Sequence, residues 1–138
     1  MDGTLINSEW LHYQVLAGQC RREGFVWSEK DNESIKGATM DSKWKHLNER
    51  HAFSRSREAW LEEFNREYRS RLTPDLGLAP QVEVVRTLHS MQIPMACVSN
   101  GEAEVVNANL EVLGIDNCFQ TVVASCDCPR GKPWPDPY

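Results

Sequence analysis

The fold class is indicated by one stretch of the sequence, Ile93-Pro94-Met95-Ala96-Cys97-Val98-Ser99-Asn100-Gly101. Its first six residues form a short continuous apolar run, which is typical of a strand buried on both faces of a parallel sheet. Ser99-Asn100-Gly101 then breaks the run as a turn. Because ligands of open α/β sheets bind beyond the carboxyl ends of the strands, we expect Ser99 to lie at a ligand site.

The segments around this run alternate between helix and strand. Helical spacing of apolar residues predicts a helix over residues 81–91, and a second over 102–113 that ends at Gly114. Residues 119–124 predict another strand. This alternation is typical of an α/β fold. Two parallel strands are too few for a stable sheet, so we expect the chain to be incomplete or to be completed by something else.

The first half of the chain reads as helical. Four helices are expected, over residues 8–23, 32–35, 41–50 and 55–72. Gly24 ends the first helix, and Pro74 closes the last. Apolar residues at helical spacing predict the buried face of the last helix, which comprises Leu61, Phe64, Tyr68 and Leu72.

Composition limits the classes of protein to which the chain can belong. Its 138 residues, 41% of them hydrophobic, suit one domain or a small domain with an insertion. With 15 basic and 20 acidic residues, the net charge of −5 argues against a nucleic-acid partner. No apolar run approaches the roughly 18 residues of a membrane helix, and no secretory signal is visible. We therefore expect a cytoplasmic protein with no membrane partner.

The cysteine pattern leaves two interpretations open. The 5 cysteines are scattered and odd in number, which does not suit a disulfide framework and favours reduced structural thiols. Alternatively, Cys126 and Cys128 could join Cys118 in a metal site, although their spacing is not typical of zinc.

Three short pieces carry residues suited to chemistry: Met1-Asp2-Gly3-Thr4-Leu5, Val98-Ser99-Asn100-Gly101 and Gly131-Lys132-Pro133-Trp134-Pro135-Asp136-Pro137. Asp2 stands in a tight turn, Ser99 follows a strand, and the prolines after Lys132 stiffen its loop. Each piece alone is a common turn or a surface lysine. Together, a carboxylate, a hydroxyl and an ammonium group form a reasonable set for phosphate transfer.

These pieces, in this order, resemble three motifs of the haloacid dehalogenase-like hydrolases. The likeness is greatest to sugar-phosphate phosphatases and phosphomutases of the phosphoglycolate phosphatase/β-phosphoglucomutase type. It implies a partial Rossmann-like core over residues 1–8 and 76–138, with an α-helical cap inserted over 9–75. The fold class expected is therefore α/β.

The resemblance also implies roles for individual residues. Asp2 would be the general acid/base, and its backbone carbonyl would face Mg²⁺. Ser99 and Asn100 would bind the phosphate, and Lys132 would neutralise charge between phosphate and nucleophile. Three residues of the cap would face the substrate, namely His12, Lys36 and Gly37. His12 reads equally well as an ordinary helix residue.

Two departures from the family pattern bear on activity. The nucleophilic aspartate belongs one residue before Met1, and the fourth motif, an acidic pair for Mg²⁺, belongs beyond Tyr138. The sequence thus looks like a fragment, or like a chain whose start was assigned to an internal methionine. We expect the 138-residue chain to hydrolyse phosphate esters negligibly.

The function implied is a Mg²⁺-dependent phosphatase that acts on a small phosphorylated sugar or acid. A phosphosugar mutase would use the same core. A dehalogenase is disfavoured, because that chemistry lacks the second aspartate that Asp2 supplies. A non-catalytic fragment or regulatory binding protein is the alternative of a different class. No feature of the sequence sets the substrate or the oligomeric state.

Overall fold

The computed structural model describes residues 1–51 and 53–138 and divides them between two compact units. The continuous unit comprises Trp10–Arg71, and the discontinuous unit comprises Met1–Glu9 and Leu72–Tyr138. These are structural units. Their use as a cap and a catalytic core remains a proposal.

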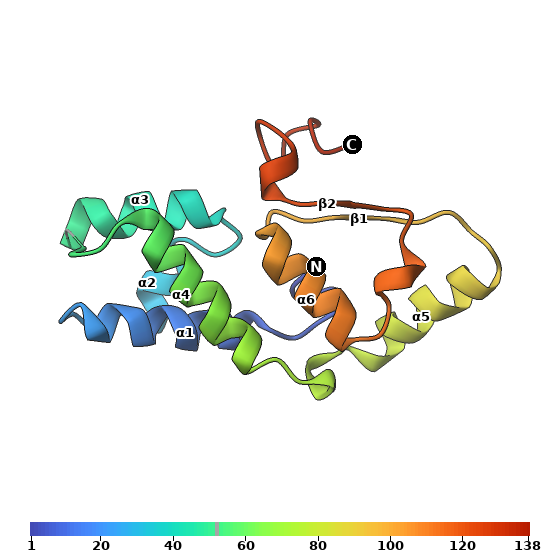
Figure 1. Ribbon diagram of the computed structural model, residues 1–138, viewed down its shortest axis with the longest axis horizontal. Helices are drawn as coiled ribbons and strands as arrows, with labels where there is room; N and C mark the ends of the chain where they lie inside the picture. Colours follow the sequence, from blue (N-terminus) through green and yellow to red (C-terminus); the bar gives the residue numbers. More distant parts are fainter. Residues whose placement is uncertain (52) are drawn as a thin grey trace. The chain divides into compact units, whose positions relative to one another are not determined.

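A parallel pair of strands lies at the centre of the discontinuous unit (Figure 1). Strand β1 (Ala96–Val98) follows helix α5 (Ala79–Ser90), and strand β2 (Thr121–Val123) follows helix α6 (Ala103–Val112). In the register, Cys97 lies opposite Val122. This β–α–β crossover, with helices in the rest of the chain, confirms the α/β class.

Strand β1 is shorter and more exposed to solvent than its sequence predicts. Only the last three residues of the apolar run are in β1. Cys97 is buried, but Ala96 is exposed and Ile93 is 40% exposed. The prediction of burial on both faces is therefore wrong. Successive strand residues point to opposite faces, and double burial needs a layer on each of them.

The first eight residues form a turn held against the segment before α5. The carbonyl of Met1 accepts hydrogen bonds from the N–H groups of Thr4 and Leu5, at 3.0 and 2.9 Å. Gly3 adopts the left-handed backbone conformation within this turn, with φ of 69°. Ile6 is fully buried, and its neighbour Asn7 donates to the carbonyl of Leu76 at 2.7 Å.

The continuous unit is helical. Its helices are α1 (Glu9–Arg22), α2 (Glu29–Glu33), α3 (Met40–His51) and α4 (Arg57–Ser70). Three of the expected helices are confirmed, but α2 begins earlier than expected. Ser28 and Asp31 form a capping box that sets its start. Among the described residues, no helix is long and apolar enough to cross a membrane.

Aromatic rings fill the interior of the continuous unit. Trp60, Phe64 and Tyr68 follow one another at four-residue spacing along α4 and are at most 1% exposed. The buried face of α4 thus includes Trp60 in place of the predicted Leu61, which is only half-buried. Leu72 lies beyond the end of the helix.

Candidate functional site

Ser99 begins a turn at the carboxyl end of β1. Its N–H donates to the carbonyl of Val123 on β2 at 2.9 Å, which extends the strand pairing by one bond. Its Oγ accepts a hydrogen bond from the N–H of Gly101 at 3.1 Å. The side chain is only 6% exposed. This arrangement fixes the hydroxyl oxygen and leaves its proton available to donate.

The second and third predicted motifs are joined through Asn100. The N–H of Lys132 donates to Asn100 Oδ1 at 2.7 Å, and Asn100 Nδ2 donates to the carbonyl of Lys132 at 2.9 Å. A Cβ atom on Gly131 would collide with Asn100 Oδ1, so a larger residue there would displace the Asn100 side chain. The Asn100 side chain therefore joins the two motifs.

The Lys132 side chain reaches back to β1. Its Nζ donates to the carbonyl of Val98 at 3.0 Å, directly before Ser99 in the chain. The structure thus brings together the hydroxyl and the ammonium group that the sequence places 33 residues apart, at Ser99 and Lys132. The peptide bond that follows Lys132 is cis.

Asp2 belongs to the discontinuous unit as well. Its Oδ1 accepts a hydrogen bond of 2.5 Å from the hydroxyl of Ser8, which is fully buried. The pKa of the Cys97 thiol, in the middle of β1, also responds to Asp2. Burial raises the pKa of this thiol, the positive charges of the N-terminus and Lys132 lower it, and the Asp2 carboxylate raises it. Asp2 and Lys132 therefore both act on the middle of β1.

The three residues predicted to face the substrate belong to the continuous unit. His12 lies on α1 and stacks on Tyr68 and Phe64, with ring centroids 4.4 and 5.7 Å apart. Lys36 and Gly37 follow α2, both are exposed, and Gly37 has a φ of 73°. Separate elements thus supply them, and their role in binding remains a prediction.

Metal ligands are few in the described part of the chain. In residues 1–51 and 53–138, no group of three or more His, Cys, Asp or Glu side chains could hold a metal ion. A metal site at Cys118, Cys126 and Cys128 is therefore wrong. Mg²⁺ uses one or two carboxylates, and waters complete its shell. The described residues do not form a magnesium site by themselves, and the expected contact of the Asp2 backbone carbonyl with Mg²⁺ remains a prediction.

Two positioning contacts were missed at the sequence level. Ser8 reads as the opening of a helix, and only the turn at Met1–Leu5 brings it to Asp2. Arg130 pairs with Asp136 through Nε and Nη2, at 2.9 and 2.8 Å. A signal did exist for this pair, since opposite charges stand at the two ends of a proline-rich loop.

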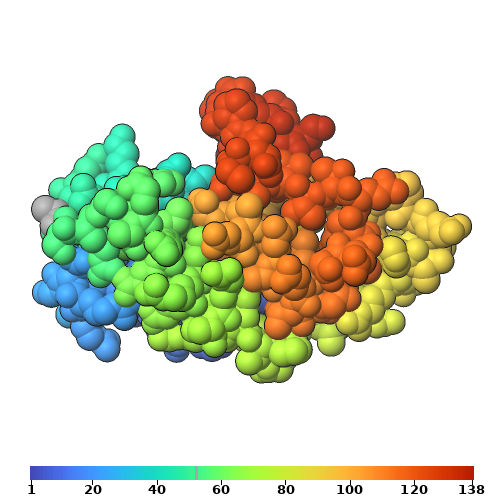
Figure 2. Space-filling view, viewed as in Figure 1, coloured from blue at the N-terminus to red at the C-terminus, as the bar shows by residue number. Residues whose placement is uncertain are grey.

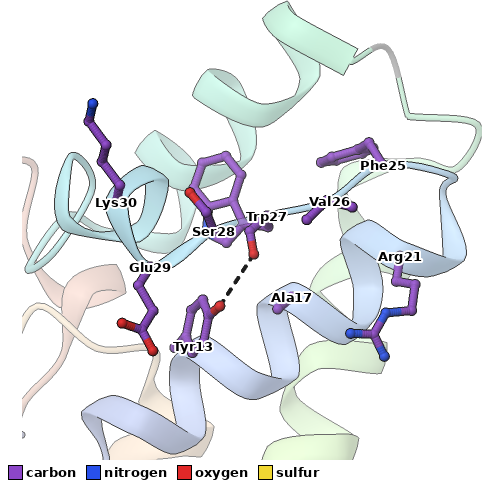
Figure 3. A pocket seen from close by; sticks show the side chains of 9 residues that line it. All are labelled: Tyr13, Ala17, Arg21, Phe25, Val26, Trp27, Ser28, Glu29 and Lys30. Atoms are coloured by element: carbon purple, nitrogen blue, oxygen red, sulfur yellow. Dashed lines mark hydrogen bonds between the residues drawn. The ribbon is translucent and has the colours of Figure 1, made fainter.

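A separate cavity of about 530 Å³ opens in the continuous unit (Figure 3). Tyr13, Phe25 and Trp27 supply aromatic walls, and Tyr13 Oη donates to the carbonyl of Trp27 at 3.4 Å. Arg21 and Lys30 line it as cations. None of the residues predicted for the site lines this cavity.

Known proteins resemble the chain over nearly its full length. It is 27% identical to validoxylamine A 7′-phosphate phosphatase of Streptomyces hygroscopicus subsp. limoneus, over 100% of this chain and 65% of that protein. The crystal structure of β-phosphoglucomutase from Clostridium difficile superposes with a TM-score of 0.78 at 25% identity, covering 97% of this chain and 63% of that one. The hydrolase YfnB of Bacillus subtilis, bound to magnesium, gives a TM-score of 0.63 at 12% identity, covering 97% and 66%.

The chain therefore spans about two thirds of the length of these relatives. The sequence pattern of one family extends over all of it. The pattern is that of the haloacid dehalogenase-like hydrolases, and it matches residues 1–138. With the three motifs and the α/β fold in agreement, the chain belongs to the haloacid dehalogenase-like hydrolase family.

Proposed function

We propose that the protein is a phosphoric monoester hydrolase that acts on a small phosphorylated sugar or acid. The observation that carries this proposal is the paired hydrogen bonding of Asn100 with Lys132, which holds a hydroxyl and an ammonium group at the carboxyl end of one strand. The phosphatase and phosphomutase names of its relatives support the substrate class.

Each residue of the site has a part in this chemistry. Ser99 donates its hydroxyl proton to a phosphoryl oxygen, and Lys132 neutralises charge that develops on the phosphate. In the version that carries the expected upstream aspartate, that carboxylate takes the phosphoryl group as the bond to the alkoxide breaks. Asp2 gives a proton to the leaving alkoxide and then takes one from the water that releases the phosphate. Ser8 holds the Asp2 carboxylate in place for both steps.

The continuous unit is assigned as the cap. In this proposal its His12, Lys36 and Gly37 contact the part of the substrate that does not react. The sequence resemblance supports the assignment, as does the compactness of Trp10–Arg71 as a unit of the structure.

Magnesium is part of the proposal for the whole protein. When bound, the ion would neutralise charge on the phosphoryl oxygens. Asp2 would provide one of its ligands, and the magnesium-bound structure of a protein with this fold supports the choice of metal. The steps assigned above to Ser99, Lys132 and Asp2 use only groups of this chain.

A phosphosugar mutase is the second candidate, because a β-phosphoglucomutase is among the similar structures. Both activities would use the same core, and they differ in whether water or a sugar hydroxyl takes the phosphate. Product analysis with a hexose phosphate separates them. A mutase returns an isomeric phosphate, whereas a phosphatase releases inorganic phosphate.

The test is hydrolysis of p-nitrophenyl phosphate with Mg²⁺, by the 138-residue chain and by a version extended upstream to carry the expected aspartate. We expect turnover only in the extended form, since the nucleophile is essential. Turnover by the shorter chain would overturn the assignment of the nucleophile. An inactive extended form that still binds phosphate would favour the non-catalytic binding protein.

A further inference from the structure

We propose that Arg130 is a positioning residue for Lys132, acting through Asp136 and Trp134. The inference rests on the proposed function, in which the Lys132 ammonium meets the phosphate. It assigns a role to a pair of charges that lies outside the residues expected to touch the substrate.

The first observation is the forked ion pair between Arg130 and Asp136. Nε of Arg130 lies 2.9 Å from Oδ1, and Nη2 lies 2.8 Å from Oδ2. The Asp136 side chain is 17% exposed and the Arg130 side chain is 53% exposed, so water screens the pair in part. Two parallel charge-assisted bonds fix direction as well as distance. The pair therefore closes residues 131–135 into a loop.

The second observation is the position of Trp134 within that loop. The Arg130 guanidinium carbon lies 4.4 Å from the centre of the Trp134 ring, a cation–π contact. The backbone N–H of Trp134 donates to the carbonyl of Gly131 at 3.1 Å. One arginine thus contacts both the middle and the far end of the loop. The segment lies at the surface (Figure 2), and its residues are half-buried or exposed.

Lys132 needs this support because its own side chain is long. Its four-carbon stem loses rotamer freedom when the ammonium is held in one place. Asn100 anchors the Lys132 backbone on one side of the loop, and the Arg130 fork anchors the residues that follow. When both anchors are in place, Nζ is directed to the carbonyl of Val98.

A competing explanation makes Arg130 a simple cation that attracts phosphate. The two explanations predict opposite effects of Asp136→Asn on the affinity for phosphate. Removal of a nearby negative charge would tighten anion binding if only charge mattered. If Arg130 positions Lys132, the same change releases the loop and weakens binding.

The experiment uses the 138-residue chain and NMR of backbone amides. We expect Asp136→Asn and Arg130→Lys each to speed hydrogen exchange at the Lys132 amide by about tenfold or more, and to weaken binding of inorganic phosphate by about tenfold. The matched control is Glu83→Gln. Glu83 is a carboxylate of the same unit that pairs with Arg86 at 3.9 Å, and its loss should change neither quantity.

Unchanged exchange at Lys132 in Asp136→Asn would overturn the proposal, as would phosphate binding that stays equal or becomes tighter. Faster exchange together with weaker binding supports it. If the unaltered chain binds no phosphate while exchange at Lys132 still responds, the proposed function fails and the positioning role stands. Exchange at the Ser99 amide, which is bonded to Val123, reports whether each variant keeps its sheet.

Discussion

At the scale of single residues, the polar groups of the site mostly hold one another. Asn100 is bonded to the backbone of Lys132, and the hydroxyl of Ser8 is bonded to Asp2. In the proposed function, such contacts would orient Lys132 and Asp2 before a ligand arrives. An enzyme gains when its dipoles and charges are already aligned, because no reorganisation is then needed during the reaction.

The Ser8–Asp2 bond gives a prediction on stability. Ser8→Ala removes a hydrogen bond to a carboxylate, so we expect a loss of about 1.5–3 kcal/mol in the free energy of unfolding. Urea titration followed by circular dichroism measures this change. Ser90→Ala is the matched control, because the Ser90 hydroxyl is exposed and bonds only a helix carbonyl. Equal effects of the two substitutions would contradict a special role for Ser8.

Cys20 gives a prediction on pH dependence. Burial, with a smaller contribution from Glu23, raises the pKa of this fully buried thiol from 9.0 to about 12. Above pH 9 the unfolded chain loses the proton while the folded chain keeps it, so stability falls as pH rises towards 12.

Between pH 8 and 10, the unaltered chain should therefore lose about 1 kcal/mol more of its unfolding free energy than Cys20→Ala, which has no thiol to ionise. Urea unfolding at the two pH values measures the difference. Cys126→Ala should follow the unaltered chain, because Cys126 is exposed. Identical pH slopes for all three proteins would exclude the raised pKa.

At the scale of elements, the sequence predicts helices better than it predicts strands or their environment. Helical spacing and end signals locate α1, α3 and α4 to within a few residues. The start of α2 differs from the prediction because the capping box of Ser28 and Asp31 sets it, whereas apolar spacing does not mark so short and polar a helix. The covering of β1 could not be predicted, because burial depends on which layers pack on each face, and a short apolar run does not specify them.

Gly18, within α1, and Gly24, just beyond its end, provide a matched test at this scale. Gly18 lies within the helix, and a Cβ there would meet only ordinary contacts at 3.6 and 3.8 Å. Gly18→Ala should therefore stabilise the chain by about 0.5–1 kcal/mol. Gly24 has a φ of 88°, so Gly24→Ala should destabilise it by about 1–2 kcal/mol. Thermal unfolding followed by circular dichroism at 222 nm measures whether each substitution stabilises or destabilises the chain. A destabilising Gly18→Ala would contradict the helix assignment.

At the scale of the whole molecule, the site combines segments that are distant in the sequence. The order of the motifs predicts that Ser99 and Lys132 belong to one site, since both follow the pattern of a known family. The pairs that support them, Ser8 with Asp2 and Arg130 with Asp136, were not predicted. A pair of this kind depends on how loops fold back in space, and neither periodicity nor spacing specifies that.

The continuous unit should also fold on its own. Its chain is unbroken, and aromatic contacts connect its helices. The ring centroids of Trp44 on α3 and Trp60 on α4 lie 5.4 Å apart, and those of His12 on α1 and Tyr68 on α4 lie 4.4 Å apart. Ion pairs add to these contacts. Arg22 lies 2.7 Å from Glu67, which joins α1 to α4. A helical segment of about this size is marginal but within the range that folds alone.

We therefore expect residues 10–71, expressed separately, to show helical circular dichroism and one cooperative thermal transition. Trp60→Ala should abolish the transition, because truncation of a fully buried aromatic side chain costs about 3–5 kcal/mol, comparable to the whole stability of a small unit. Trp10→Ala should leave the transition nearly unchanged, since Trp10 is 46% exposed. A coil spectrum for the unaltered segment would show instead that these helices depend on the rest of the chain.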